Sequence, residues 1–243
     1  MPLTDYQVLT FDCYGTLIDW ETGMIQALSP LTARAAQAGV ALARDQVLQA
    51  HARHESSLQH ERPELPYSAL LALVYGRLAA EWGVPASAGE RDRYGRSVRH
   101  WPAFADSAGA LQYLKQHYKL VILSNVDNAS FAFSNARLQV QFDAVHTAQD
   151  IGSYKPSPRN FQYLLDALGG EGIGRGQVLH VAESLFHDHA PANAFGLASC
   201  WIHRRHGQDG FGATMDPGSQ PRVDFRFTSM AELVQAHRQA LLA

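Results

Sequence analysis

The sequence contains little cysteine and little charge, and no long apolar segment. Only two of its 243 residues are cysteines, Cys13 and Cys200, which excludes a disulfide framework and a zinc site built on cysteine pairs. Charged residues make up 18% and hydrophobic residues 46%, so extended disorder is not expected. Twenty Lys and Arg against 23 Asp and Glu give a formal net charge of −3, which disfavours a strongly basic nucleic-acid binder.

Membrane and export signals are also missing from the sequence. No apolar run approaches the roughly 20 residues of a membrane-spanning helix. The first residues, MPLTDYQVLTFD, lack the basic and apolar segments of a signal peptide. We therefore expect a soluble, cytoplasmic globular protein with reduced cysteines, as a monomer or a homodimer. Neither nucleic acid nor a membrane is expected as a partner.

Short apolar segments alternate with helical patterns over most of the chain. Strands are predicted at 7–11, 119–123, 144–147, 178–182 and 199–202, with an edge strand at 223–227. Helices are predicted at 108–117, 130–138, 158–168, 189–195 and 231–241. Near-continuous apolar strands separated by helices are typical of a buried parallel sheet. The predicted fold class is α/β, with a doubly wound, mostly parallel sheet.

Residues 20–100 contain no convincing strand. Helical periodicity runs over 24–38, 43–59, 67–82 and 88–100, interrupted by glycine and proline. An all-helical segment is thus predicted to be inserted after the first strand. We expect an α/β core domain of residues 1–19 and 101–243 and a helical cap domain of residues 20–100. The stretch 204–222, rich in Gly, Asp and His, is predicted to be a long surface loop.

Polar residues stand at the ends of several predicted strands. Asp12 follows the first strand, Ser124 and Asn125 follow the second, and the segment 183–188 follows the strand at 178–182. Lys155 lies in the loop after the third strand. Ligands bind at the carboxyl ends of strands in open α/β sheets, so these residues are expected to converge on one site.

The same residues resemble the four sequence motifs of the haloacid dehalogenase (HAD) superfamily. Residues 11–17 (FDCYGTL) are similar to the first motif, 123–125 to the second, 154–156 to the third and 183–188 to the fourth. Their order and spacing agree across the whole predicted sheet, and the inserted helices resemble the superfamily's cap. The resemblance therefore implies a HAD-like Rossmannoid core and hydrolase chemistry.

The first motif also indicates a branch of the superfamily. The pattern Asp-x-Tyr-Gly-Thr-Leu resembles the type II 2-haloacid dehalogenases, and segments 101–104 and 180–189 resemble azetidine-2-carboxylate hydrolases of the same branch. Phe161 stands where the dehalogenases have a tyrosine, and Leu185 where they have an asparagine. The loss of both polar groups suggests a changed pocket, which favours the azetidine hydrolase or another small acid.

The resemblance implies a catalytic role for five residues. A desolvated, positioned carboxylate can displace a leaving group and form an ester, and Asp12 is the candidate nucleophile. Lys155 would keep this carboxylate ionised, and Thr16 and Ser124 would orient it by hydrogen bonds. Asp188 would orient or deprotonate the water that cleaves the ester. The alternative readings are a turn aspartate, an exposed lysine and capping hydroxyls.

Position 14 indicates the class of reaction. HAD phosphatases carry a second aspartate two residues after the nucleophile as general acid, and Tyr14 stands there instead. A tyrosine, with an ordinary pKa of about 10, can line a pocket but does not readily replace a carboxylic acid. A leaving group that needs little acid help fits better, such as halide or the protonated, strained ring nitrogen of azetidine-2-carboxylate. Displacement at C2 would give a 2-hydroxy acid.

Five residues are expected to bind a small carboxylic-acid substrate. Asn125 matches an asparagine around the substrate of the dehalogenases, and Arg53 is the candidate cap arginine for the carboxylate. Tyr14, Trp20 and Phe161 are expected to line the pocket. The alternative for Arg53 is a solvated arginine paired with a glutamate, and for Trp20 packing at the hinge between core and cap.

No cofactor is expected, but a metal alternative stays open. Magnesium in a phosphatase would be held by Asp12, Glu183 and Asp188 through hard oxygen ligands. Type II dehalogenases usually have a serine at the position of Glu183, so the acid here keeps this alternative open. A second alternative is a non-catalytic HAD-like binding module.

Overall fold

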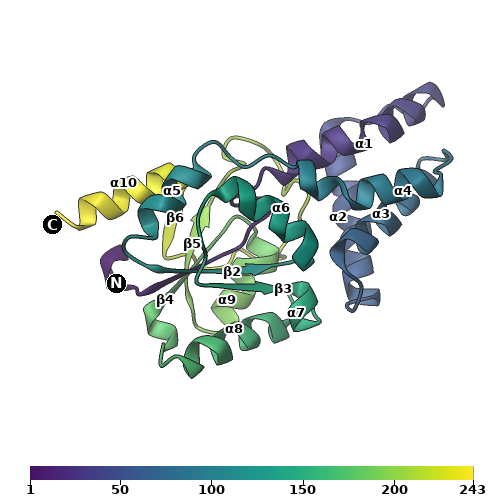
Figure 1. Cartoon of the computed structure of the whole chain (residues 1–243). Coiled ribbons are helices and arrows are strands. Elements are labelled where there is room, and N and C mark those ends of the chain that lie inside the picture. Colours follow the sequence, from purple (N-terminus) through teal and green to yellow (C-terminus); the bar gives the residue numbers. More distant parts are fainter. Residues whose placement is uncertain (243) are drawn as a thin grey trace.

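One six-stranded parallel sheet forms the centre of the computed structural model, which describes residues 1–242 (Figure 1). The strands are β1 (Val8–Phe11), β2 (Lys119–Ser124), β3 (Ala144–Thr147), β4 (Val178–Ala182), β5 (Ala198–Ile202) and β6 (Phe225–Phe227). Their order is β3-β2-β1-β4-β5-β6, and every neighbouring pair is parallel. This order confirms the predicted fold class and places β1 between β2 and β4 in the interior.

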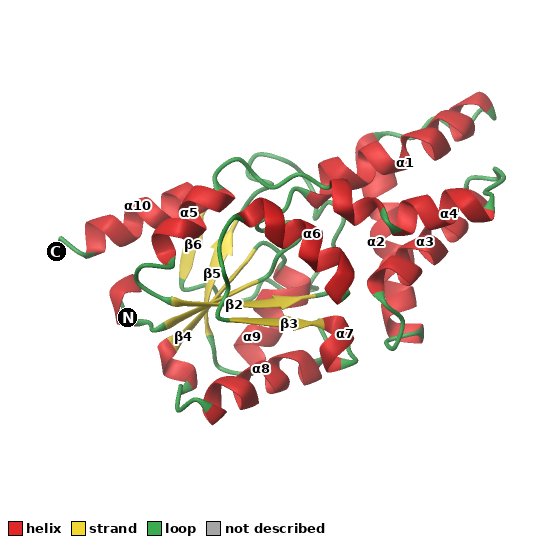
Figure 2. Cartoon of the chain, in the orientation of Figure 1, coloured by secondary structure: helices red, strands yellow, loops and turns green. Residues whose placement is uncertain are grey.

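Helices cover both faces of the sheet (Figure 2). Leu9 and Phe11 of β1 belong to one apolar cluster with residues of α5, α6 and α10, whereas Val8 belongs to a second with residues of α7, α8 and α9. Successive side chains of a strand point to opposite faces, so a strand with four buried residues supplies both clusters. The helices are α5 (Ser107–Leu114), α6 (Asn128–Leu138), α7 (Ala148–Ile151), α8 (Pro158–Gly170), α9 (Ala190–Ala194) and α10 (Met230–Ala240).

The segment between β1 and α5 is helical, without a strand in residues 20–100. It contains α1 (Trp20–Gln37), α2 (Arg44–Glu61), α3 (Tyr67–Glu81) and α4 (Ala88–Gly95), and the 3-10 turn η2 (Ser97–His100). These helices lie at the end of the sheet opposite to both termini (Figure 1). The helix predicted at 88–100 is shorter than expected. It ends at Gly95, which lies so close to α3 that a Cβ atom there would be 2.4 Å from the Ser68 carbonyl oxygen.

Four short helical elements of the structure were not predicted from the sequence. They are α7, the 3-10 turns η1 (Leu3–Asp5) and η3 (Arg175–Gln177), and the π-helical turn η4 (Leu185–His189). Each of them is too short to produce a periodic pattern of apolar residues. Within residues 1–242, no helix is both long and apolar enough to cross a membrane.

Candidate active site

The nucleophile candidate Asp12 stands directly after β1 and is 6% exposed. The chain then turns back on itself through Gly15, whose φ of +93° is in the region that favours glycine. The turn brings Thr16 to Asp12, and the Thr16 hydroxyl donates to Asp12 Oδ2 at 2.8 Å. The same hydroxyl accepts from the backbone N–H of Glu183 at 2.9 Å. Thr16 therefore holds one carboxylate oxygen of Asp12 in place.

Lys155 lies between two carboxylates and is 1% exposed. Its Nζ atom donates to Asp12 Oδ1 at 2.9 Å, to Asp188 Oδ1 at 2.6 Å and to the Leu123 carbonyl oxygen at 2.9 Å. Asn125 holds the backbone of Lys155 at both ends, since its Nδ2 donates to Lys155 O and its Oδ1 accepts from Lys155 N–H. An ammonium has three protons, so the hydrogen-bonding capacity of Lys155 is fully used.

Asp188 is completely buried and lies in the π-helical turn η4. Besides Lys155, its Oδ1 atom contacts Nε2 of His180 at 2.9 Å, and Nδ1 of His180 contacts the Thr10 hydroxyl at 2.8 Å. An ionised carboxylate only accepts, so Nε2 carries the proton and, in the neutral ring, Nδ1 accepts from Thr10. Asp188 Oδ2 has no hydrogen-bond partner among the described residues. One oxygen of Asp188 is thus fixed and the other is free for a further donor.

Burial and charge separate the pKa values of the two carboxylates. Burial raises the pKa of Asp188, but the Lys155 ammonium and the His180 hydrogen bond lower it more, so its pKa is below the usual range. Burial raises the pKa of Asp12, and the negative charge of Asp188 adds to this, against the opposing effect of Lys155. The pKa of Asp12 is therefore raised. The two carboxylates therefore differ in pKa, with that of Asp12 above its ordinary value and that of Asp188 below it.

These residues line a small, narrow cavity. Seven of its lining residues form two groups on opposite sides, which we call the sheet side and the helix side. The sheet side comprises Asp12, Asn125, Lys155 and Asp188, and the helix side comprises Glu55 and Gln59 of α2 and Tyr67 of α3. The remaining lining residues are Tyr14, Trp20, Ser184, His187 and Thr214. Thr214 comes from the segment 204–222, so this predicted surface loop reaches the cavity.

The structure brings most of the predicted residues together. Thr16, Lys155 and Asp188 meet at or beside Asp12, and Tyr14, Trp20 and Asn125 line the cavity. Ser124 ends β2 and is 2% exposed, but its hydroxyl has no hydrogen-bond partner. The predicted bond from Ser124 to Asp12 is therefore not present.

Arg53 and Phe161 lie away from the cavity, which corrects their expected placement. The Arg53 side chain is 54% exposed and pairs with Glu81 at 2.9 Å. Positions two apart on a helix differ in direction by about 200°, so Arg53 points away when Glu55 faces the cavity. Phe161 is fully buried on α8, with its ring 5.1 Å from that of His180. It packs beneath the sheet and does not line the cavity at the strand ends.

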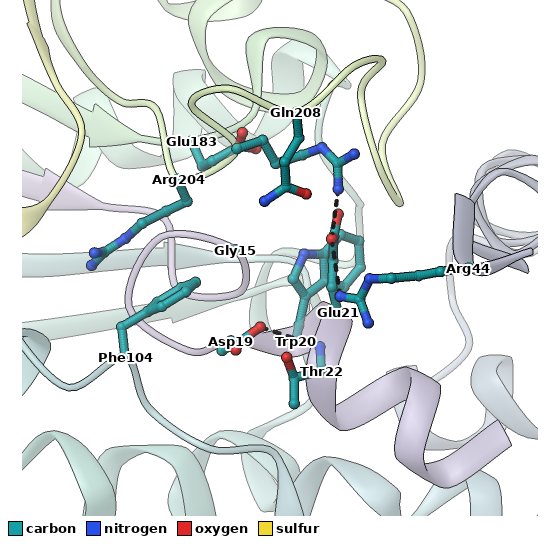
Figure 3. Close-up of a pocket in the computed structure, with 11 residues that line it drawn as sticks. Gly15, Asp19, Trp20, Glu21, Thr22, Arg44, Phe104, Glu183, Arg204 and Gln208 are labelled. Carbon is teal, nitrogen blue, oxygen red and sulfur yellow. Dashed lines mark hydrogen bonds and ion pairs between the residues drawn. The ribbon is translucent and has the colours of Figure 1, made fainter. Parts of the chain in front are cut away.

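Glu183 lies in a neighbouring cavity. This cavity is lined by Gly15, Asp19, Trp20, Glu21, Thr22, Arg44, Phe104, Glu183, Arg204, Arg205 and Gln208 (Figure 3). Trp20 lines both cavities. Burial and the charge of Glu21 raise the pKa of Glu183 to about 8, against the opposing effect of Arg205.

The donor set therefore does not fit magnesium as the structure stands. Asp12 and Asp188 face one cavity and Glu183 the other, while Lys155 Nζ occupies the space between the two aspartates. Across residues 1–242, no three His, Cys, Asp or Glu side chains gather in a group that could hold a metal ion.

Sequence reasoning missed several residues of the site. His180 lies in the segment 180–189 that carries a family resemblance, but no role is predicted for it there because it occupies a position in a predicted apolar strand. Glu55, Gln59 and Tyr67 sit on helices whose orientation toward the core domain is not encoded in local periodicity. A closer reading of α2 could have found Glu55, since it is an acid on the face that also carries the buried residues Ala52 and Leu58.

Comparisons with known proteins found a relative in sequence and several in fold. (S)-2-haloacid dehalogenase 4A of Burkholderia cepacia is 26% identical over 198 residues, which cover 80% of this chain and 82% of that protein. The fold is shared with L-2-haloacid dehalogenase of Xanthobacter autotrophicus with chloropropionic acid covalently bound, at 17% identity and a TM-score of 0.76 over 96% and 98% of the two chains. It is also shared with the HAD-hydrolase YfnB of Bacillus subtilis bound to magnesium, at 18% identity and a TM-score of 0.71 over 95% and 97%.

A family model also matches most of the chain. The model of haloacid dehalogenase-like hydrolases matches residues 6–196, which include all the residues of the sheet side of the cavity and all of α1 to α4. On this match, the chain belongs to the haloacid dehalogenase-like hydrolases.

Proposed function

We propose that the protein displaces the C2 substituent of a small 2-substituted carboxylic acid through an ester on Asp12. The observation that carries this proposal is the buried Asp12 carboxylate, held by Thr16 and Lys155 at the bottom of a small cavity. Its two bonded neighbours restrict rotation of the carboxylate and so hold it ready for attack. The product is a 2-hydroxy acid.

The reaction has two steps. An oxygen of Asp12 attacks C2 from the side opposite to the leaving group, a C–O bond forms, and the C2 bond to the substituent breaks with its electron pair going to the substituent. Water then attacks the carboxyl carbon of the ester, which releases the hydroxy acid and restores the Asp12 carboxylate with loss of one proton. Asp188 is ionised and has one free oxygen, so it can orient this water.

Two leaving groups suit this site. The Tyr14 hydroxyl contacts Ser134 Oγ at 2.9 Å, and burial raises its pKa well above the ordinary value, so Tyr14 is a poor proton donor. Halide needs no proton to leave. The ring nitrogen of azetidine-2-carboxylate is already protonated and is expelled from a strained ring; it takes up the proton that ester hydrolysis releases. The product would then be 4-amino-2-hydroxybutanoate.

We propose metal-free chemistry, because the ammonium of Lys155 takes the position between the two aspartates. The alternative is a magnesium-dependent phosphatase that uses Asp12, Glu183 and Asp188. It requires Glu183 to leave the neighbouring cavity. Turnover that survives chelation and extensive dialysis supports metal-free displacement, and activity restored only by magnesium favours the phosphatase.

Isotope labelling tests the ester directly. Purified protein in excess is mixed with L-2-chloropropanoate and L-azetidine-2-carboxylate in metal-free H₂¹⁸O, and products and peptides are analysed by mass spectrometry. We expect a 2-hydroxy acid without the label and ¹⁸O in the peptide that contains Asp12. Label in the product after one turnover would instead show direct attack by water. Failure to trap any covalent adduct across a wider panel of substrates would favour the non-catalytic binding module.

A further inference from the structure

The helix side of the cavity contains a buried carboxylate that the proposed reaction does not use. Glu55 is 4% exposed and lines the same cavity as Asp12. The Tyr67 hydroxyl donates to Glu55 Oε1 at 2.7 Å. No described residue donates a hydrogen bond to Glu55 Oε2. The nearest basic group is His51, whose Nδ1 atom is 3.8 Å from this oxygen. One oxygen of Glu55 is therefore without a partner.

Within residues 1–242, no charged basic group lies within 4 Å of Glu55. Burial lowers the pKa of His51 to about 3, so this neighbour is neutral at physiological pH. Burial also raises the pKa of Glu55 itself to about 7, with the Tyr67 hydrogen bond opposing. A buried carboxylate without a cation is costly, and a cationic ligand removes that cost.

The whole cavity has an excess of acid. Its lining contains the carboxyl groups of Asp12, Glu55 and Asp188 but no arginine, and Lys155 is its one ammonium. All three protons of that ammonium are already used on the sheet side. A substrate with only a carboxylate would add a further negative charge, whereas a substrate that also carries an ammonium would add none.

The aromatic walls favour the same ligand. Trp20, Tyr14 and Tyr67 line the cavity beside Glu55. The faces of such rings attract cations, and desolvation strengthens the attraction. A carboxylate among aromatic rings is thus a suitable environment for a small organic ammonium.

We propose that Glu55 is a specificity-determining residue that binds an ammonium group of the substrate, so that the substrate is a small acid carrying both a carboxylate and an ammonium. The inference rests on the proposed function for the site and narrows its substrate class. It favours the cyclic amino acid over the halogenated acid.

Binding measurements test this inference without relying on turnover. The Asp12→Asn variant is titrated calorimetrically with L-azetidine-2-carboxylate and with cyclobutanecarboxylate, its carbocyclic isostere without the ammonium. We expect the amino acid to bind at least about tenfold more tightly at pH 8, as for a hydrogen bond between charged groups. Adding Glu55→Gln should abolish the difference. Adding Glu61→Gln instead, on the exposed surface of the same helix, should preserve it.

The outcomes separate the two proposals. Equal binding of the two ligands, or a preference unchanged by Glu55→Gln, overturns the role of Glu55 even if the wild type converts L-2-chloropropanoate. A preference that depends on Glu55 supports the role even if the labelling experiment fails to detect an ester on Asp12. Circular dichroism of the double variant confirms that a lost preference is not caused by unfolding.

Discussion

The two sides of the cavity differ in how their charges are satisfied. On the sheet side, the ammonium of Lys155 pairs with Asp12 and Asp188, and Thr16 and His180 hold the remaining contacts. On the helix side, the Tyr67 hydroxyl is the one hydrogen-bond donor to Glu55 among residues 1–242. On the sheet side both carboxylates have a cationic partner, although one oxygen of Asp188 has no donor, whereas Glu55 on the helix side has no cationic partner among the described residues. Under the two proposals above, the sheet side carries out the reaction and the helix side binds the ammonium group of the substrate.

The difference follows from how each side is built. The sheet side stands on the ends of neighbouring parallel strands, whose backbone positions are fixed by the register of β1 with β2 and β4. The helix side consists of residues of α2 and α3, which belong to the segment inserted between β1 and α5. Substitution on the sheet side should therefore affect reaction and folding, whereas substitution on the helix side should affect selectivity.

Asp12→Asn should have the largest effect. Removal of the nucleophile is expected to lower turnover by at least about 10⁴-fold, as for other covalent catalysts. The fold should survive because asparagine keeps the size of the side chain. Steady-state turnover of both candidate substrates and thermal unfolding provide the measurement. Turnover within tenfold of wild type would contradict the role of Asp12.

Lys155→Met should destabilise the sheet side. It removes the ammonium from between two buried carboxylates, and breaking such a pair costs about 3–5 kcal/mol. Lys119→Met is the matched control, because Lys119 pairs with Glu171 at the surface, where the loss should be below about 1 kcal/mol. Urea unfolding measures both. Equal losses of unfolding free energy in the two variants would show that the buried ion pairs of Lys155 stabilise the protein no more than the surface ion pair of Lys119.

Glu55→Gln should stabilise the free protein in a pH-dependent manner. The pKa of Glu55 is about 7 in the folded state and about 4.5 unfolded, so wild-type stability falls as pH rises from 4.5 through 7. Glutamine does not ionise, and its advantage should grow by up to about 3 kcal/mol between pH 4.5 and 8. Unfolding in urea at both pH values measures this. A constant difference would contradict a buried, unpaired Glu55.

His180→Leu should have the smallest effect of the four substitutions, and it should slow only the hydrolysis of the ester. It removes a donor from Asp188, so ester hydrolysis should slow by about 10- to 100-fold while ester formation continues. Intact-protein mass spectrometry during turnover should then show accumulated ester. His180→Gln, which keeps a donor, should restore part of the rate. Equal slowing of both steps would argue for a general structural defect.

The fold and much of the sheet side could be predicted from sequence. Asp12, Lys155 and Asp188 follow strands with clear apolar patterns, and the carboxyl ends of parallel strands meet. The helix side could not be predicted in the same manner. The error at Arg53 shows the reason, because a shift of two positions along α2 exchanges an exposed arginine for the buried Glu55. Local periodicity gives the buried face of a helix but not what that face meets.

The positions of Glu183 and Phe161 illustrate two further limits of prediction from the sequence. Glu183 is one residue beyond β4, yet its side chain enters the cavity next to that of Asp12, and nothing in a motif indicates on which side of Trp20 it lies. Phe161 has the apolar character expected of a pocket wall, but α8 packs against the face of the sheet. Both outcomes depend on contacts between residues far apart in the chain.

The arrangement around Lys155 has an electrostatic consequence for the proposed reaction cycle. In the resting protein two carboxylates share one ammonium, so the buried sheet side has one negative charge in surplus. Esterification of Asp12 removes that charge and leaves Lys155 and Asp188 as a neutral couple. In the proposed cycle, the buried charges on this side would therefore balance in the covalent intermediate and not in the resting protein, and this loss of repulsion between the two carboxylates would favour ester formation.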